Sequence, residues 1–251
     1  MFFKHNDISI YYEVHGNKKD TILILPGWGN TRSSFYNLIN YFKNNYTIYI
    51  IDYPSFGNSP IPNKELTIYD YADLIYHFIK KEEINPIIIA HSFGGRISAI
   101  LIGKYNLKIE KLVLMDVAGI KRFNPKVFIK QKIYKLLKKL TYLLPKIKQE
   151  YFRNKLLLLF GSIDYQNIPV VMKKTFKNII NEDLKKYYKN ITTNTLIIWG
   201  EKDIDTPLKD AYFLKKNIKD SGLIIYENSR HFSYLDKLYL TNLIINEFIK
   251  K

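Results

Sequence analysis

The stretch that most constrains the fold of this chain is residues 86–95, PIIIAHSFGG, where an apolar run leads directly into a serine and two glycines. Residues 87–90 are typical of a buried parallel strand, and residues 96–102 are typical of a helix. A strand, a serine, small residues and a helix in direct succession predict a nucleophile elbow, a sharp turn that raises a serine hydroxyl above the sheet edge. The usual motif is G-x-S-x-G, and Ala90 replaces its first glycine. The alternative is that Ser92 only caps the helix, a position that serine favours.

Strand and helix patterns alternate along most of the remaining chain. Strands are expected at residues 8–14, 21–25, 46–51, 87–90, 111–115, 195–199 and 222–226, and helices at 33–43, 67–83, 96–102, 207–218 and 233–249. Such alternation predicts an α/β fold built on a doubly wound, mostly parallel sheet. The loops that follow the strands should gather at one sheet edge, where folds of this type bind ligands.

Residues 120–193 interrupt the alternation and predict a helical cap inserted into a core made of residues 1–119 and 194–251. Their apolar residues recur at helical spacing on one arc, as in Ile129, Ile133 and Leu136, and we expect this face to pack on the site. Residues 121–160 carry twelve lysines or arginines and one acid, about two-thirds of the net charge of +16. The expected interpretation is a solvated basic face. The alternative is weak association with an anionic membrane through residues 121–160.

Composition narrows the class of protein further. The 251 residues include no cysteine, which excludes disulfides, thiol catalysis and cysteine-based metal sites. The chain becomes charged within its first residues, unlike a signal peptide, and no apolar run reaches the roughly 18 residues of a membrane span. No nucleic-acid recognition motif accompanies the basic charge. We therefore expect a cytoplasmic protein that binds no nucleic acid and needs neither metal nor organic cofactor, with its oligomeric state left open.

A serine nucleophile needs a base within hydrogen-bonding reach and an acid that orients the base. Of the five histidines, His231 is the best candidate, because it follows the last predicted strand in a loop that returns over the strand ends. Asp203, after the strand at 195–199, is the preferred acid, because it gives the chain order Ser, Asp, His that accompanies an elbow. Asp116, after the strand at 111–115, is the alternative acid, or else a carboxylate bonded to backbone N–H groups.

Two backbone N–H groups should stabilise an oxyanion. The N–H of Phe93 follows the serine at the start of its helix. The loop after residue 25 should supply the second donor. Pro26 has no N–H, so we expect the amide of Trp28 to do so. Its ring should either wall the acyl pocket or pack against the cap.

With these residues assembled, the chain resembles the α/β-hydrolase superfamily, in its cap-bearing, single-domain serine hydrolases. The matching stretches follow the family order: LPGWG (25–29), DYPSFGNS (52–59), AHSFGG (90–95), LVLMD (112–116), LIIWGEKD (196–203) and HFSYLD (231–236). The resemblance implies an α/β-hydrolase fold with an inserted helical cap, Ser92 as nucleophile, Asp203 as acid and His231 as base. It also implies oxyanion donors at Trp28 and Phe93. Family members commonly carry His-Gly where this chain has Pro26 and Gly27, and glycine where Arg230 precedes the base.

The expected function is a carboxylesterase-like serine hydrolase that forms an acyl-enzyme with a small ester-like substrate, a carboxylic ester or a thioester. Thioesterase, peptidase, lactonase and carbon–carbon bond hydrolase chemistry use the same residues, and the sequence does not choose among them. One alternative is a catalytically weak protein of the same fold that binds a small molecule. Another is a lipid esterase that works at a membrane surface through its basic cap helix.

Overall fold

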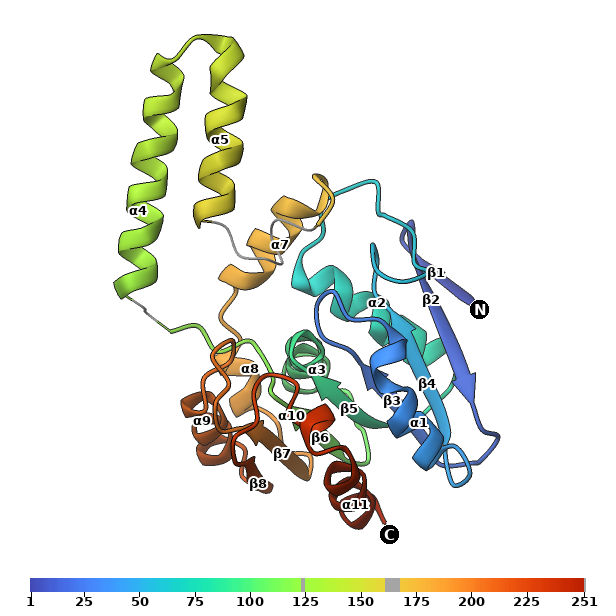
Figure 1. The fold of residues 1–251 in the computed structure, drawn as a ribbon. Coiled ribbons are helices and arrows are strands. Elements are labelled where there is room, and N and C mark those ends of the chain that lie inside the picture. Colours follow the sequence, from blue (N-terminus) through green and yellow to red (C-terminus); the bar gives the residue numbers. More distant parts are fainter. Residues whose placement is uncertain (123–124, 161–167, 251) are drawn as a thin grey trace.

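A single twisted sheet forms the centre of the protein (Figure 1). The computed structural model describes residues 1–122, 125–160 and 168–250. Within these residues, eight strands form one sheet in the order β1-β2-β4-β3-β5-β6-β7-β8. The strands are β1 (Phe2–His5), β2 (Ile8–His15), β3 (Thr21–Leu25), β4 (Thr47–Asp52), β5 (Ile87–His91), β6 (Leu112–Met115), β7 (Thr195–Gly200) and β8 (Ser221–Tyr226). Strands β3 to β8 are parallel, and only the β1–β2 and β2–β4 pairs are antiparallel, so the predicted doubly wound, mostly parallel sheet is confirmed.

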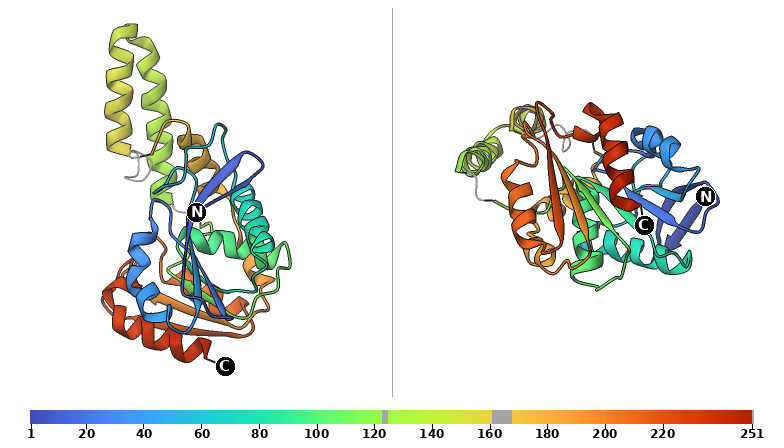
Figure 2. Two further views of the ribbon diagram at one scale, coloured as in Figure 1. Left: turned by 90° about the vertical axis from the view of Figure 1, so that its right-hand side faces the viewer. Right: turned by 90° about the horizontal axis from the view of Figure 1, so that it is seen from below.

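Helices cover both faces of the sheet (Figure 2). The helical segments are η1 (Arg32–Phe35), α1 (Tyr36–Phe42), α2 (Ile68–Lys81), α3 (Phe93–Gly103), α4 (Pro125–Leu140), η2 (Thr141–Leu143), α5 (Lys146–Phe160), α7 (Met172–Asn181), α8 (Lys185–Lys189), α9 (Lys209–Asn217), α10 (Ser233–Asp236) and α11 (Leu238–Ile249). Helices α2, α3, α8 and α9 share one hydrophobic core with the sheet, and α1 and α11 share the other.

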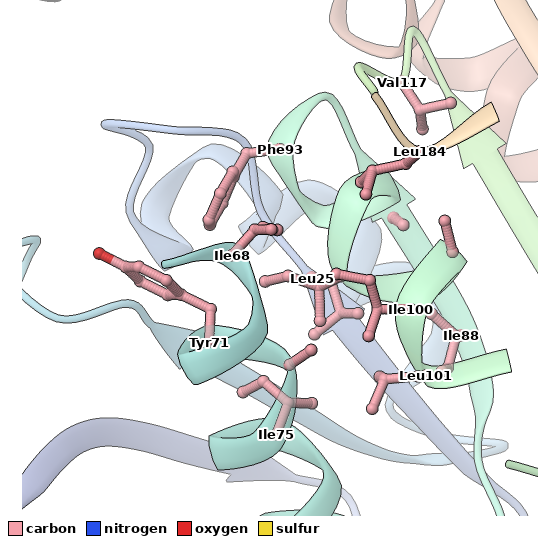
Figure 3. Packing of buried hydrophobic residues seen from close by; sticks show 14 of the residues in the cluster. Leu25, Ile68, Tyr71, Ile75, Ile88, Phe93, Ile100, Leu101, Val117 and Leu184 are labelled. Carbon is pink, nitrogen blue, oxygen red and sulfur yellow. The ribbon is translucent and has the colours of Figure 1, made fainter. Parts of the chain in front are cut away.

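The strands bury both of their faces, which explains their continuous apolar sequences. In β3, Leu23 and Leu25 join the core under α2 and α3, whereas Ile22 and Ile24 join the core under α1 and α11. Figure 3 shows Leu25 between side chains of α2 and α3. Each fully buried side chain of this size stabilises the fold by roughly 1.5–3 kcal/mol. This dry core fixes the carboxyl ends of the parallel strands relative to one another.

Two elements differ from the sequence prediction. Strand β1 was not expected, although Asn6 and Asp7 both have positive φ, 47° and 62°, as in the tight hairpin turns that these residue types favour. The predicted closing helix is divided into α10 and α11 at Lys237, whose φ of −123° and ψ of 42° are not helical. Both differences leave the sheet and its loops in place.

The segment between β6 and β7 contains α4, α5, α7 and α8. Helices α4 and α5 form an antiparallel hairpin that projects away from the sheet (Figures 1 and 2). The prediction that the apolar face of this helix packs on the site is wrong, because Ile129 is 56% exposed and Leu136 is 60% exposed. The physical reason is the reversal at η2, which makes α5 the packing neighbour of α4.

Residues 123–124 and 161–167 of the predicted cap lie outside the described residues. Helix α8, which falls inside the predicted boundaries 120–193, packs against α3 and α9 beside the sheet. In the described part of the chain, no helix is both long enough and apolar enough to cross a membrane.

Candidate active site

Ser92 lies at the turn between β5 and α3, where its backbone has φ 46° and ψ −106°. These angles match the first central residue of a type II′ turn, a conformation that L-residues rarely adopt. The N–H of Gly94 donates to the carbonyl of Pro26 over 3.0 Å, which ties the start of α3 to the loop after β3. A Cβ on Gly94 would lie 2.1 Å from the carbonyl oxygen of Leu25, so only glycine permits this approach of α3 to β3.

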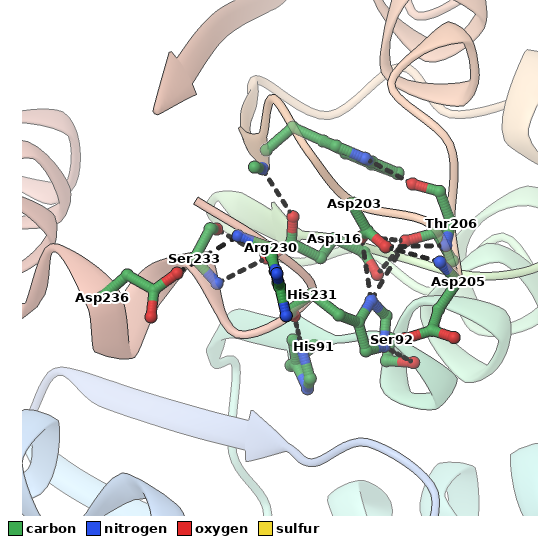
Figure 4. Close-up of polar contacts among 12 residues, drawn as sticks. His91, Ser92, Asp116, Asp203, Asp205, Thr206, Arg230, His231, Ser233 and Asp236 are labelled. Carbon is green, nitrogen blue, oxygen red and sulfur yellow. Dashed lines mark hydrogen bonds and ion pairs between the residues drawn. The ribbon is translucent and has the colours of Figure 1, made fainter. Parts of the chain in front are cut away.

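Three side chains from separate loops form a continuous hydrogen-bonded chain (Figure 4). The Oγ of Ser92 lies 2.9 Å from Nε2 of His231, and Nδ1 of His231 lies 2.9 Å from Oδ2 of Asp203. The loops follow β5, β7 and β8, whose carboxyl ends lie at the same sheet edge. The structure therefore brings together the predicted nucleophile, base and acid. Because an ionised carboxylate can only accept a hydrogen bond, the Asp203 contact requires the proton on Nδ1 and leaves Nε2 to accept the Ser92 proton.

The Asp203 carboxylate is held by a full set of donors. Its Oδ1 accepts from the N–H groups of Asp205 and Thr206 over 2.8 and 2.9 Å, and its Oδ2 accepts the Thr206 hydroxyl over 2.6 Å. Burial opposes ionisation, but the hydrogen bond and charge of His231 and the bonds from Thr206 keep the pKa of Asp203 below its usual value. Burial would lower the pKa of His231, but the bond to and charge of Asp203 raise it above the usual value.

Asp116, the alternative acid, is fully buried behind His231 and bonds to other groups. Its Oδ1 accepts the N–H of Gly200 over 2.8 Å, and its Oδ2 accepts the N–H and hydroxyl of Ser233 over 3.2 and 2.5 Å. Burial raises the pKa of Asp116 to about 7 despite these bonds. Asp116 thus joins the end of β6 to the end of β7 and to the segment that follows His231.

His91 supports His231 from below, a role that the sequence did not indicate. It is fully buried, and its Nε2 lies 2.8 Å from the carbonyl oxygen of His231, to which it donates. Burial lowers the pKa of His91 to about 3, so the ring is neutral and keeps one N–H for this bond. The only signal in the sequence was its position beside the serine, at the end of a strand whose side chains alternate between faces.

The N–H groups of Trp28 and Phe93 are the predicted oxyanion donors. Among the described residues, neither group donates to a backbone carbonyl. The bond from Gly94 to Pro26 joins the two loops that carry them. The rings of Trp28 and Phe93 meet edge to face, with centroids 5.2 Å apart. Both N–H groups are thus free of backbone partners on loops that are tied together.

A cavity of about 1070 Å³ lies over Ser92 and His231. The Trp28 ring forms part of its wall and packs against Phe176 of α7, with centroids 5.4 Å apart. Two further α7 residues, Ile179 and Ile180, also line the cavity. Helix α7 is anchored to the core, since the Arg96 guanidinium of α3 donates to its Ile179 carbonyl over 2.9 Å. The cavity wall therefore combines the predicted oxyanion loop with the apolar face of α7, a helix from the segment between β6 and β7.

Two groups of side chains in the described ranges could offer ligand atoms to a metal ion. Asp203, Asp205 and His231 form one group, but the Asp203–His231 hydrogen bond already uses the facing atoms. His5, Asp73 and His77 form the other group, on the surface where β1 meets α2. There, Nε2 of His5 is bonded to Asp73 over 3.0 Å, and the two imidazole rings stack.

Comparison with known proteins identifies the family. A family model for the alpha/beta hydrolase fold matches residues 20–163, more than half of the chain, so this protein belongs to the α/β-hydrolase family. The chain is 25% identical over 267 residues to the pimeloyl-[acyl-carrier protein] methyl ester esterase of Wigglesworthia glossinidia brevipalpis, covering 96% of this chain and 98% of that protein. It is 24% identical over 273 residues to monoacylglycerol lipase ABHD6 of Mus musculus, covering 98% of this chain and 80% of that protein.

Solved structures agree on the fold. An esterase from Exiguobacterium antarcticum superposes with a TM-score of 0.77 at 22% identity, covering 100% of this chain and 99% of that chain. The enol-lactonase from Burkholderia xenovorans LB400 gives a TM-score of 0.77 at 15% identity and covers 100% of both chains. The resemblance seen in the sequence motifs is thereby confirmed. The expectation of a hydrolase of this fold is supported by relatives that are esterases and lipases.

Proposed function

We propose that this protein is a serine hydrolase that cleaves carboxylic esters through an acyl-enzyme. The observation that carries the proposal is the unbroken hydrogen-bonded chain from Ser92 through His231 to Asp203, with 2.9 Å at each step. This arrangement lets one imidazole remove the serine proton while the carboxylate stabilises the imidazolium that forms. A protein that only binds a small molecule has no need of such an arrangement.

The reaction has two steps. His231 Nε2 takes the proton of Ser92 as its Oγ attacks the ester carbonyl, and the imidazolium then gives this proton to the departing alcohol. In the second step His231 removes a proton from the water that attacks the acyl-enzyme, and the imidazolium gives this proton to Ser92 Oγ as the bond to the acyl group breaks and the acid leaves. The N–H groups of Trp28 and Phe93 donate to the oxyanion in both steps, and each should lower the barrier by roughly 3 kcal/mol.

The cavity supports an apolar acyl group. Its aromatic and aliphatic walls, including Trp28, Phe176 and Ile180, favour a hydrocarbon chain. Arg96 and Asp205 also belong to the lining. Two relatives named above act, by their names, on a methyl ester and on a monoacylglycerol, which supports an oxygen ester as the substrate class. Within the predicted cap, residues 120–193, helix α7 is the element that forms part of this cavity wall.

The test is labelling with a fluorophosphonate probe, which reacts only with an activated serine. We expect the wild-type protein to be labelled and to hydrolyse a panel of esters of graded chain length, and Ser92→Ala to do neither. Ser98→Ala serves as the matched control, because Ser98 is a buried serine of α3 bonded to the Gly94 carbonyl. Labelling that persists in Ser92→Ala, or a folded wild type that neither labels nor hydrolyses any ester, would contradict the proposal.

A further inference from the structure

The tip of the α4–α5 hairpin, residues 138–148, is the part of the described chain that stands furthest from the sheet (Figures 1 and 2). Helix α4 leads up to it, η2 turns the chain, and α5 leads back. In the described residues, the main packing partners of α4 are α5 and η2. The tip is therefore presented to the surroundings and is not covered by the core.

This tip carries large apolar side chains that face solvent. Leu143 is 82% exposed and Ile147 is 90% exposed, and Leu140 and Tyr142 beside them are also exposed. Single exposed apolar residues are ordinary on a protein surface, but several within eight residues at one protruding end indicate a binding surface.

The tip does not depend on the side chains of Leu143 and Ile147 for its shape. Gln149 donates to the carbonyl of Leu144 over 2.9 Å, and the Thr141 hydroxyl donates to the carbonyl of Lys138 over 2.7 Å. The Arg153 guanidinium of α5 reaches the hydroxyl of Thr141 over 3.3 Å. Polar contacts on the inner side thus hold the turn, and the apolar side chains are displayed on its outer side.

Positive charge surrounds the apolar tip. Lys138 and Lys139 precede it, Lys146 and Lys148 follow it, and all four are exposed. Residues 121–149 contain no aspartate or glutamate. An apolar wedge inside a ring of lysines matches the boundary of an anionic membrane, where acyl chains lie beneath phosphate headgroups. The same charge would repel the tip of a second copy, and a nucleic acid would have no use for the apolar wedge.

We propose that the tip of the hairpin, residues 138–148, docks on the surface of an anionic lipid membrane. Leu143 and Ile147 enter the acyl boundary, and the four lysines lie at the level of the headgroups. Docking through the tip leaves the sheet and the cavity outside the bilayer. Membrane docking is independent of the proposed hydrolysis, because the tip contains none of the residues assigned to that reaction.

Co-sedimentation of the full chain with vesicles tests the proposal. We expect binding to vesicles of phosphatidylcholine mixed with phosphatidylglycerol, weakened by high salt, and little binding to phosphatidylcholine alone. The double variant Leu143→Ser, Ile147→Ser should bind the vesicles at least about tenfold more weakly, since each substitution removes an apolar group that would enter the membrane. Replacing the four tip lysines by glutamine should weaken it on the order of a hundredfold.

A matched charge control separates the tip from the net charge of the protein. Lys18, Lys19, Lys108 and Lys219 are exposed and lie in loops at the amino ends of parallel strands, opposite the cavity. Changing these four to glutamine removes the same charge, and vesicle binding should stay within a few fold of wild type. Hydrolysis of a water-soluble short-chain ester, or the thermal transition if no ester is turned over, should be unchanged in all three variants and reports folding.

Several results would overturn the proposal. Equal weakening in the control variant would show that only overall charge matters. Equal binding to both kinds of vesicle, or none to either, would remove the anionic membrane as partner. A concentration-dependent dimer that is lost with Leu143→Ser, without vesicle binding, would assign the tip to a second copy of the chain.

Discussion

The backbone at Ser92 leads to a prediction about stability that does not involve catalysis. A non-glycine residue at φ 46° and ψ −106° carries strain of about 1–3 kcal/mol, whereas glycine adopts these angles freely. A glycine also lowers the free energy of unfolding by about 0.4–1 kcal/mol, because it gives the unfolded chain more conformational freedom. The free energy of unfolding of Ser92→Gly should therefore exceed that of Ser92→Ala by about 1 kcal/mol, within a range of roughly 0–2.5.

Ser92→Ala is the matched comparison. Both variants lose the hydroxyl and its hydrogen bond to His231, but alanine keeps the Cβ and hence the strain. For a chain of this size, 1 kcal/mol corresponds to about 2–4 °C in Tm, so Ser92→Gly should unfold about 2–4 °C above Ser92→Ala. Differential scanning calorimetry and urea unfolding at the same pH would measure the difference.

The result that refutes this reasoning is a Ser92→Gly variant that is no more stable than Ser92→Ala. It would mean that the elbow holds Ser92 in its turn without a strain that glycine can relieve. Asn228, at φ 62° in an exposed turn, gives a reference for the method. There, Asn228→Gly should be more stable than Asn228→Ala, because alanine is strained at that angle.

Three further predictions concern the support of the site. Activity should rise with pH as His231 loses its proton, and the midpoint of this rise should lie above pH 6.5 because the pKa of His231 is raised. Asp203→Asn should move the midpoint to lower pH and lower kcat about 10⁴-fold, and a pH–rate profile of both proteins checks this. His91→Phe should lower kcat about tenfold with little change in KM, because it removes the donor to the His231 carbonyl; an unchanged kcat would show that His231 needs no such support. Gly94→Ala should destabilise the fold by about 1–3 kcal/mol, whereas Gly222→Ala, whose Cβ would find no atom closer than 4.0 Å, should be nearly neutral in the same urea titration.

The sequence was sufficient for the parallel strands and for the helices that flank them, because both depend on local patterns. Strands buried on both faces must be apolar throughout, so residues 21–25 and 87–90 could be recognised without knowing their neighbours. The serine and glycines at the end of β5 indicated a turn for the same reason. Strand β1 was not predicted, because only one of its four side chains, that of Phe3, is buried. The only sequence feature that indicated it was the turn at Asn6 and Asp7.

The site needed more than local pattern. Asp203 and His231 are 28 residues apart, and His231 and Ser92 are 139 apart, so their contacts depend on the order of β5 to β8 in the sheet. The sequence could name these three residues as candidates but could not choose between Asp203 and Asp116 by distance. Thr206 and His91 act through a hydroxyl and a ring N–H that meet their partners only after folding.

The hairpin separates what the sequence determined from what the tertiary structure decided. The spacing of Ile129, Ile133 and Leu136 determined that a helix there has one apolar face, because side chains three and four residues apart share a face. It could not determine what covers that face. The reversal at η2 directed α4 onto α5 instead of the sheet and left the apolar tip exposed. Periodicity reports which residues lie together on one element, and only the path of the chain in space decides what those residues contact.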